Sequence, residues 1–258
     1  MLDIKEIESF YPEYLRGFKR NILREYVQYK ILECIFNSNF ADSLAFMGGT
    51  AAHIIHGNTR FSEDLDFDNL GFGRKEFKEL SEFIKRGLGR EGYIVKSKAV
   101  FKGAYSSYLS LPGVLYDNRL SRHKEEVLLI KIDAEPQNFK YKADKPVINK
   151  FDVFMQVNVV PVSLLLSQKI CAIFTRKRPM GRDFYDAIFL LGKTKPDLKY
   201  LKARLKIKNK HDLKNKLLQK CDNLNFRQLS KEVEHFLFVP GDSKKILLFR
   251  DYIKDIDF

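Results

Sequence analysis

The chain has 258 residues, of which 45% are hydrophobic and 31% are charged, a composition typical of a globular protein with a substantial core. It contains no run of about 18 apolar residues, which excludes a membrane-spanning helix, and its first residues lack the apolar stretch of a signal peptide. Three widely spaced cysteines argue against a disulfide framework and a zinc site. We therefore expect a cytoplasmic protein that does not associate with membranes.

The net charge of +13 favours a polyanionic partner, because Lys and Arg side chains that neutralise phosphates release bound counterions. The excess is concentrated in one place. Segment 193–216 contains ten Lys and Arg residues against two Asp, a local net charge of +8. A solvated, Lys-rich helical surface explains this segment equally well.

Hydrophobic spacing predicts a mixture of helices and strands in the first part of the chain. Apolar residues at helical spacing between Lys5 and Asn37 indicate two helical segments, and the short apolar run Leu44–Met47 indicates a buried strand. The further elements expected here are a helix over 50–57 capped by Thr50, a strand over 64–68, a helix over 74–90, and strands over 93–100, 106–111 and 126–133.

Beyond Val157 the pattern becomes helical. Pro161 fits the start of a helix over 162–176, a second helix is expected over 182–191, and two or three more amphipathic helices follow. We therefore predict an α/β (α+β) fold with two domains. Residues 1–155 would contain N-terminal helices and a mixed sheet, and residues 156–258 would be helical.

Three aspartates alternate along one predicted strand. Because side chains alternate across a strand, Asp64, Asp66 and Asp68 share one face. Carboxylates this close repel one another unless a cation lies among them, and their oxygens suit Mg²⁺. A solvated acidic edge strand is the alternative. Asp133 ends a later apolar strand and is the candidate third acid, with Glu135 on the same face as the second choice.

The turn Gly48-Gly49-Thr50 precedes Asp64 and stands between a predicted strand and a predicted helix. Glycines at such a junction let backbone N–H groups approach phosphates, and the start of a helix favours anions. A strand, this turn, a short helix and an Asp-x-Asp strand in succession therefore indicate a site for a nucleotide and a metal ion.

Lys169 lies in the middle of the apolar face of the helix expected over 162–176. A lysine in that position must extend to solvent or find an acidic or phosphate partner. Asp183 and Asp186 on the next helix are candidate partners, and Arg182 has the spacing to pair with Asp186. A Lys–Asp network that only joins two helices is the structural alternative.

The segment 46–67 resembles the first motif of AbiEii-type nucleotidyltransferase toxins, in which a Gly-Gly or Gly-Ser turn precedes an Arg-x-Ser-x-Asp-x-Asp strand. The positions that match this motif and the later ones are Arg60, Ser62, Asp64 and Asp66, then Lys131-Ile-Asp133, Gln168-Lys169, and Arg182-Asp183 with Asp186. They stand in family order between residues 44 and 191. Asp68 falls outside the motif.

The resemblance implies the polymerase-β-like nucleotidyltransferase fold and the toxin of a type IV toxin–antitoxin system. It implies transfer of NMP from an NTP to RNA at the tRNA 3′ end, which would block translation, and silencing by a cognate AbiEi-type antitoxin. Asp64, Asp66 and Asp133 would bind two Mg²⁺ ions. Lys169 and Asp186 would contribute to nucleotide binding and catalysis, with Arg182 and Asp183 arranging them.

On this hypothesis Gly48 and Gly49 hold the β and γ phosphates, and Thr50 and Ser62 belong to the same nucleotide-binding set. Asp133 also positions or deprotonates the acceptor hydroxyl. Arg60 would either reach the triphosphate or brace the Asp64 carboxylate.

Three alternatives stay open. In the first, the acceptor of the nucleotide is a protein or a small molecule. In the second, the chain is a glycosyltransferase whose Asp-x-Asp strand binds a nucleotide sugar, which explains neither the Gly-Gly-Thr turn nor Lys169. In the third, the chain is a non-catalytic basic RNA-binding protein. Tyr105, Tyr108 and Tyr116 have the chemistry to stack on bases, although packing in a strand core explains them more simply.

Overall fold

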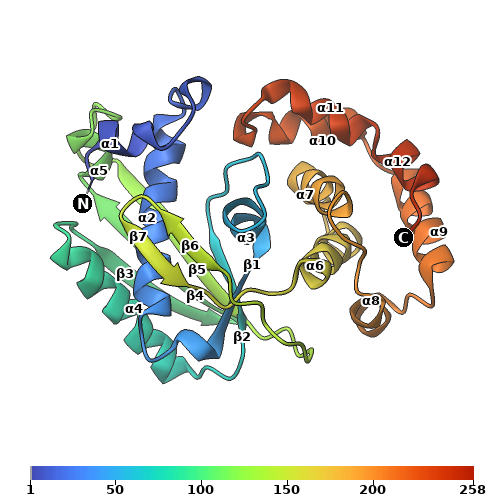
Figure 1. The fold of residues 1–258 in the computed structure, drawn as a ribbon, viewed down its shortest axis with the longest axis horizontal. Coiled ribbons are helices and arrows are strands. Elements are labelled where there is room, and N and C mark those ends of the chain that lie inside the picture. The colour runs from blue at the N-terminus through green and yellow to red at the C-terminus, as the bar shows by residue number, and fades with distance from the viewer. Residues whose placement is uncertain (1) are drawn as a thin grey trace. The chain divides into compact units, whose positions relative to one another are not determined.

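The computed structural model describes residues 2–258 (Figure 1). The chain divides into two compact units. The N-terminal unit contains the chain up to Ala51 and the residues Ser62–Val160, and the C-terminal unit contains Ala52–Phe61 and Pro161–Phe258. A mixed sheet with helices in the first unit and helices in the second confirm the predicted fold class. The division into domains 1–155 and 156–258 stays a prediction.

A five-stranded mixed sheet forms the centre of the N-terminal unit, with the strand order β1-β2-β5-β4-β3. Its strands are β1 (Leu44–Met47), β2 (Leu65–Asn69), β3 (Lys96–Lys102), β4 (Ala104–Pro112) and β5 (Val127–Glu135). β2 and β5 are parallel, whereas the β1–β2, β5–β4 and β4–β3 pairs are antiparallel. Each of these strands was expected from the sequence to within a few residues at its ends.

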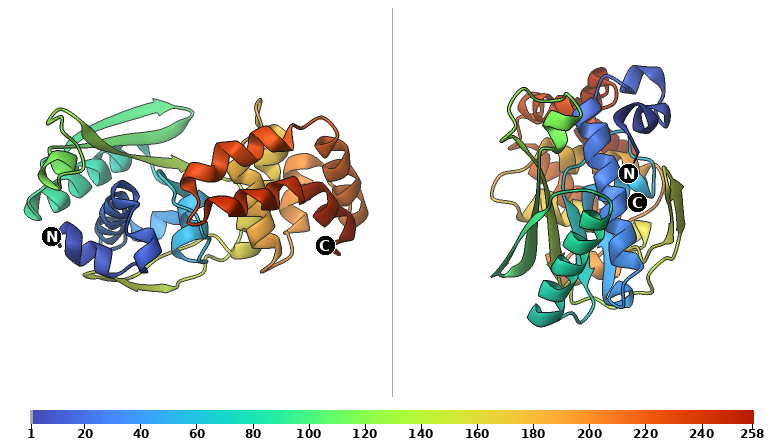
Figure 2. Two further views of the ribbon diagram at one scale, coloured as in Figure 1. Left: turned by 90° about the horizontal axis from the view of Figure 1, so that it is seen from above. Right: turned by 90° about the vertical axis from the view of Figure 1, so that its left-hand side faces the viewer.

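Helices α2 (Lys19–Phe36) and α4 (Arg74–Arg90) lie on the same side of this sheet in both views of Figure 2. Helix α4 has the predicted bounds, and its buried apolar residues recur every three or four positions: Phe77, Leu80, Ile84 and Leu88. Phe67 of β2 faces this helical layer, because its ring lies 6.2 Å from the ring of Phe36 on α2. Side chains that alternate with Phe67 therefore point to the other side of the sheet, and Asp66 is one of them.

The shorter elements of the N-terminal unit are α1 (Ile4–Ser9), α5 (Val114–Asp117), β6 (Val147–Lys150) and β7 (Val153–Gln156). The β6–β7 hairpin is absent from the sequence prediction, because its two-residue turn, Phe151-Asp152, lacks the usual Gly or Asn. Phe151 adopts a left-handed φ of 58°. Its ring lies 5.0 to 5.2 Å from the rings of Phe10, Tyr26 and Tyr29, and this packing offsets the backbone strain.

The C-terminal unit is helical. Its main helices are α6 (Val162–Thr175), α7 (Gly181–Leu191), α8 (Leu198–Leu205), α9 (Lys210–Cys221), α10 (Phe226–Val233), α11 (Lys244–Leu247) and α12 (Phe249–Asp255). Helices α6 and α7 confirm the two predicted helices. Five α-helices follow α7 where two or three were expected, because α11 and α12 are too short to show a helical repeat in the sequence. Among residues 2–258, no helix has the length and apolarity needed to span a bilayer.

Candidate active site

The predicted acids lie where the parallel strands β2 and β5 run side by side. Asp66 on β2 is the register partner of Asp133 on β5, and both residues are partly exposed. Asp64 stands immediately before β2, which begins at Leu65. The Asp64 carboxylate is close enough to Lys131 on β5 to act on its pKa. The strand pairing thus brings Asp133 beside Asp64 and Asp66, from which it is distant in sequence.

Gly48 lies against Asp66 at the end of β1. The antiparallel β1–β2 ladder pairs Met47 with Asp66, so β1 leads directly to this point. Gly48 has a left-handed φ of 80°, and a Cβ atom added to it would overlap the Asp66 side chain. Both the backbone conformation and the close approach therefore require glycine here.

Gly48→Ala is expected to lower the rate of nucleotide transfer by about a hundredfold, because the new Cβ must displace the Asp66 carboxylate. Gly57→Ala is the matched control, since Gly57 has a φ of 77° but no atom within 4 Å of an added Cβ. Both variants carry the same backbone strain. Transfer assays and thermal unfolding of the two variants separate strain from displacement, and an equal loss of activity in both would show that the close approach is unimportant.

Two buried side chains fix the backbone around Asp64. Helix α3 (Gly48–Ile54) begins at Gly48, so the expectation that Thr50 caps this helix is wrong. Thr50 is instead fully buried and its hydroxyl donates to the carbonyl oxygen of Asp64. Gln28 of α2 donates through Nε2 to the carbonyl oxygen of Ser62, at 3.0 Å. The role of Gln28 was not predicted from the sequence, because a single amide within an apolar helix forms no distinctive pattern.

Both carboxylate oxygens of Asp133 have partners in this structure. The Lys131 ammonium lies 2.6 Å from Oδ2, and the hydroxyl of Ser106 on β4 donates to Oδ1 at 2.6 Å. Burial acts to lower the pKa of Lys131, but Asp133 outweighs it and the net shift is upward. Lys131 is therefore a cation that offsets part of the negative charge of the three acids.

The donor set suits Mg²⁺, because it consists of carboxylate oxygens on adjacent backbone segments. Within residues 2–258, no three acidic, His or Cys side chains converge to hold a metal ion by themselves. Mg²⁺ commonly binds through one or two carboxylates, with water and substrate phosphates completing its shell. Asp64 and Asp66 fit that mode, and Asp133 is already engaged by Lys131.

Asp68 has a structural role. It is 2% exposed, and its two oxygens accept hydrogen bonds from the backbone N–H of Gln137 and the hydroxyl of Tyr141, both at 2.7 Å. These bonds tie the segment after β5 to β2, which leaves Asp68 little capacity to bind a metal ion. Glu135, its register partner on β5, is exposed.

A buried ion pair between Arg60 and Asp186 lies inside the C-terminal unit. Arg60 Nε is 2.6 Å from Asp186 Oδ1 and Nη2 is 2.7 Å from Oδ2, a bidentate arrangement in which both side chains are at most 2% exposed. Burial acts to raise the pKa of Asp186, but Arg60 and Lys169 outweigh it and lower this pKa to about 2. Arg60 was expected either to reach the triphosphate or to brace Asp64, and in this structure it pairs with Asp186.

Lys169 of α6 belongs to the same network, and of the alternatives expected for it the structure shows an acidic partner. Its Nζ lies 2.8 Å from Asp186 Oδ2 and 3.9 Å from Asp183 Oδ1. Arg176 Nε lies 2.8 Å from Asp183 Oδ2. Arg182 makes no ion pair with any described residue, so the expected Arg182–Asp186 pair is wrong; Arg60 and Lys169 occupy both oxygens of that carboxylate.

Two polar residues that the sequence analysis missed attach the segment 52–61 to helix α7. The fully buried Asn58 donates from Nδ2 to Asp186 Oδ1 at 2.7 Å, and the hydroxyls of Thr59 and Tyr185 lie 2.9 Å apart. This segment connects helix α3 to Asp64 in the chain. The Asp186 network thus holds this segment against α7 within the C-terminal unit.

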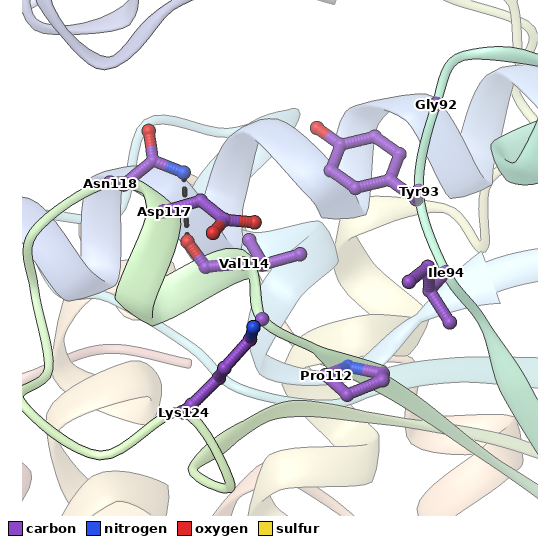
Figure 3. Close-up of a pocket in the computed structure, with 9 residues that line it drawn as sticks. Gly92, Tyr93, Ile94, Pro112, Val114, Asp117, Asn118 and Lys124 are labelled. Atoms are coloured by element: carbon purple, nitrogen blue, oxygen red, sulfur yellow. Dashed lines mark hydrogen bonds between the residues drawn. The ribbon is translucent and has the colours of Figure 1, made fainter.

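A cavity of about 410 Å³ in the N-terminal unit is separate from these groups (Figure 3). Figure 3 shows the ring of Tyr93, the side chains of Asp117 and Lys124, and the hydrogen bond from Asn118 to the carbonyl oxygen of Val114. None of the residues predicted for the site lines this cavity. The candidate active site is therefore the carboxylate group at β2 and β5 and not this cavity.

Comparison with known structures identifies proteins of similar fold. The fold is similar to the crystal structure of JHP933 from Helicobacter pylori, with a TM-score of 0.54 and 15% identity over 90% of this chain and 91% of that chain. It is also similar to the structure of a candidate nucleotidyltransferase from H. pylori, with a TM-score of 0.54 and 15% identity over 91% of this chain and 96% of the other. Comparison with curated protein sequences gave no match.

A family model described as nucleotidyl transferase AbiEii toxin of a type IV toxin–antitoxin system matches residues 30–237. The match includes the glycine turn, the strands β2 and β5 with their acids, and the network around Asp186. The family implies an NTP substrate and an antitoxin partner. The chain therefore belongs to the AbiEii family of nucleotidyltransferase toxins, and it is an enzyme that transfers nucleotides.

Proposed function

We propose that this enzyme transfers NMP from an NTP to an RNA acceptor, the 3′ end of tRNA, in a reaction that depends on Mg²⁺. The observation that carries the proposal is the meeting of Gly48, Asp66 and Asp133, which two separate strand pairings bring to one place. An anionic cluster beside a turn that only glycine fits is an arrangement that serves a metal-bound triphosphate.

In this proposal Asp64 and Asp66 bind the metal, and the backbone of Gly48 and Gly49 faces the β and γ phosphates. Bound Mg²⁺ would neutralise the triphosphate and stabilise the attacking and leaving oxygens. Asp133 orients the acceptor hydroxyl and accepts its proton. The acceptor oxygen then forms a bond to the α-phosphorus, the bond from that phosphorus to the bridging oxygen breaks, and pyrophosphate leaves.

Lys131 and Ser106 support Asp133 in this role. Each holds one of its oxygens at 2.6 Å, so the carboxylate has a fixed orientation before substrate binds. A positioned base removes the cost of ordering it during the reaction. Participation of Lys169 and Asp186 in nucleotide binding and catalysis stays a prediction, with Asp183 and Arg182 arranging them.

An RNA acceptor is supported by the basic surface of helices α8 and α9 in the C-terminal unit. The segment 193–216 carries its net charge of +8 on side chains that are mostly exposed. Its two acids have other roles: Asp197 caps α8 by accepting from the N–H of Tyr200, and Asp212 pairs with Lys216 at 3.2 Å. The unpaired lysines remain available to phosphates. We place the reaction in the cytoplasm, with an AbiEi-type antitoxin as the regulatory partner.

The acceptor is tested with total tRNA, Mg²⁺ and each α-labelled NTP in turn. Half of the tRNA is oxidised with periodate, which destroys the terminal 2′,3′-diol. We expect label on intact tRNA and no label on oxidised tRNA. Equal labelling of both would overturn transfer to the 3′ end. Label on added total protein or on a small molecule, with none on tRNA, would overturn the RNA acceptor while keeping the nucleotidyltransferase.

A further inference from the structure

One side of the central sheet carries no helix of the N-terminal unit along β3, β4 and β5. We name it the open sheet face and define it by the side chains that alternate with the buried ones: Lys96, Lys98, Tyr108, Ser110, Leu129 and Lys131. Helices α2 and α4 lie on the opposite side in both views of Figure 2. Leu129 is 47% exposed in the middle of the sheet, which agrees with an uncovered face.

The residues of the open sheet face form rows across the strands. One row is Lys98–Tyr108–Lys131, so the tyrosine ring stands between two lysines. The Lys131 ammonium lies 5.7 Å from the centre of that ring. The next row, about 7 Å farther along the strands, contains Ser106 and Asp133. The tyrosine is therefore one row away from the candidate base.

The chemistry of this face is that of a platform for single-stranded nucleic acid. Such platforms combine an aromatic ring, on which a base stacks, with cations that follow the phosphates. Lys96 and Lys98 are exposed and pair with no acid among the described residues. No carboxylate lies on the face between Asp133 and the far ends of the strands. A protein partner would instead require apolar area, and Leu129 and Val127 are the exposed apolar side chains of β5.

Tyr105 and Tyr108 both belong to β4, but only Tyr108 lies on the open sheet face, where a base would stack. The ring of Tyr105 lies 5.7 Å from Phe77 of α4 and 5.2 Å from Phe101, so it belongs to the packed side of the sheet. Tyr108, three positions on, points to the opposite side and is partly exposed. The sequence alone suggested core packing for both.

We propose that the open sheet face binds the single-stranded 3′ end of the acceptor, with one base stacked on Tyr108 and phosphates held by Lys96 and Lys98. This placement directs the terminal hydroxyl along β4 and β5 towards Asp133. The proposal rests on the proposed function, because it assumes that the acceptor is RNA.

The test measures binding of a fluorescent single-stranded RNA of about eight nucleotides, a length in the usual range for such platforms. The full chain carries Asp64→Asn so that no transfer occurs. Tyr108→Leu is expected to weaken binding about tenfold, and Tyr108→Phe to leave it nearly unchanged, because stacking needs the ring alone. Lys96→Gln with Lys98→Gln should reduce the slope of log K against log salt by about 1.4, or about 0.7 for each phosphate contact.

The matched control is Lys75→Gln with Lys85→Gln, which removes the same charge from α4 on the other side of the sheet. Its salt slope should equal that of the parent protein. Equal effects of the two lysine pairs, or binding by Tyr108→Leu as tight as by Tyr108→Phe, would overturn the proposal. All variants are compared by thermal unfolding to confirm that they fold.

A second assay distinguishes this inference from the proposed function. With Asp64 restored, Tyr108→Leu should raise KM for RNA while kcat stays near that of the parent. If the parent labels RNA and Tyr108→Leu does so with the same KM, the inference fails and the function stands. If the parent labels only protein or a small molecule, the proposed function fails, and loss of oligonucleotide binding in Tyr108→Leu still supports a nucleic-acid platform.

Discussion

Asp186→Ala is expected to lower the free energy of unfolding by about 3–5 kcal/mol, the cost of leaving a buried cation without its partner. Asp186 is fully buried, and its carboxylate is the shared acceptor for Arg60, Lys169 and Asn58. Removing it leaves two cations in the interior of the C-terminal unit. Denaturant unfolding of the wild type and the variant measures the difference.

Two controls show whether the buried charge is the cause. Asp251→Ala removes an exposed partner of Lys254 and should change stability by less than about 0.5 kcal/mol. A variant with Asp186→Leu, Arg60→Met and Lys169→Met removes all three charges and should recover much of the loss. A loss below about 1 kcal/mol in Asp186→Ala would contradict the ion-pair account.

The same pair predicts a pH dependence of stability. The pKa of Asp186 is lowered to about 2, whereas an unfolded aspartate has a pKa of about 3.9. A carboxylate with a depressed pKa contributes its full stability above the unfolded pKa and loses it as the pH falls. The stability difference between the wild type and Asp186→Asn should therefore be constant above about pH 5 and shrink as the pH falls towards 2.

Asp66→Asn is expected to reduce nucleotide transfer by about a thousandfold, because it removes a charged ligand from the centre of the reaction. Asp68→Asn is the matched control on the same strand. Its side chain accepts from Gln137 and Tyr141, so its replacement should lower stability by about 1–3 kcal/mol and leave the transfer rate of folded protein within about tenfold. Equal activity losses at a temperature where both variants are folded would mean that Asp66 has no special role.

The sequence predicted the elements of the sheet and the acids on it because their signals are local. Alternation placed Asp66 opposite the buried Phe67, and the structure agrees. The pairing of Asp66 with Asp133 depends on β2 and β5 being parallel neighbours, and nothing in either strand specifies the other. Only the resemblance to the family motifs placed Asp66 and Asp133 in one site on the basis of the sequence.

Long-range polar contacts were the part that the sequence did not predict. Arg60 lies close in sequence to the glycine turn and to Asp64, which suggests the triphosphate or the Asp64 carboxylate as its partner. In the structure it pairs with Asp186, 126 positions away. Gln28, Asn58 and Tyr141 were missed for the same reason, because a buried polar residue reveals its partner only when the chain is folded. Within the N-terminal unit, Gln28 and Tyr141 hold the backbone beside Asp64 and the side chain of Asp68.

The most direct test of nucleotide transfer at the Asp66 site uses the same NTP labelled either at the α-phosphorus or at the γ-phosphorus. Each is incubated with the wild type and total cellular acceptors, in Mg²⁺ or in a chelator, beside Asp66→Asn and Asp68→Asn. We predict acceptor label from the α-labelled NTP alone, only with Mg²⁺, retained by Asp68→Asn and lost in Asp66→Asn. Label from the γ-phosphorus, or transfer that persists in folded Asp66→Asn, would contradict the account.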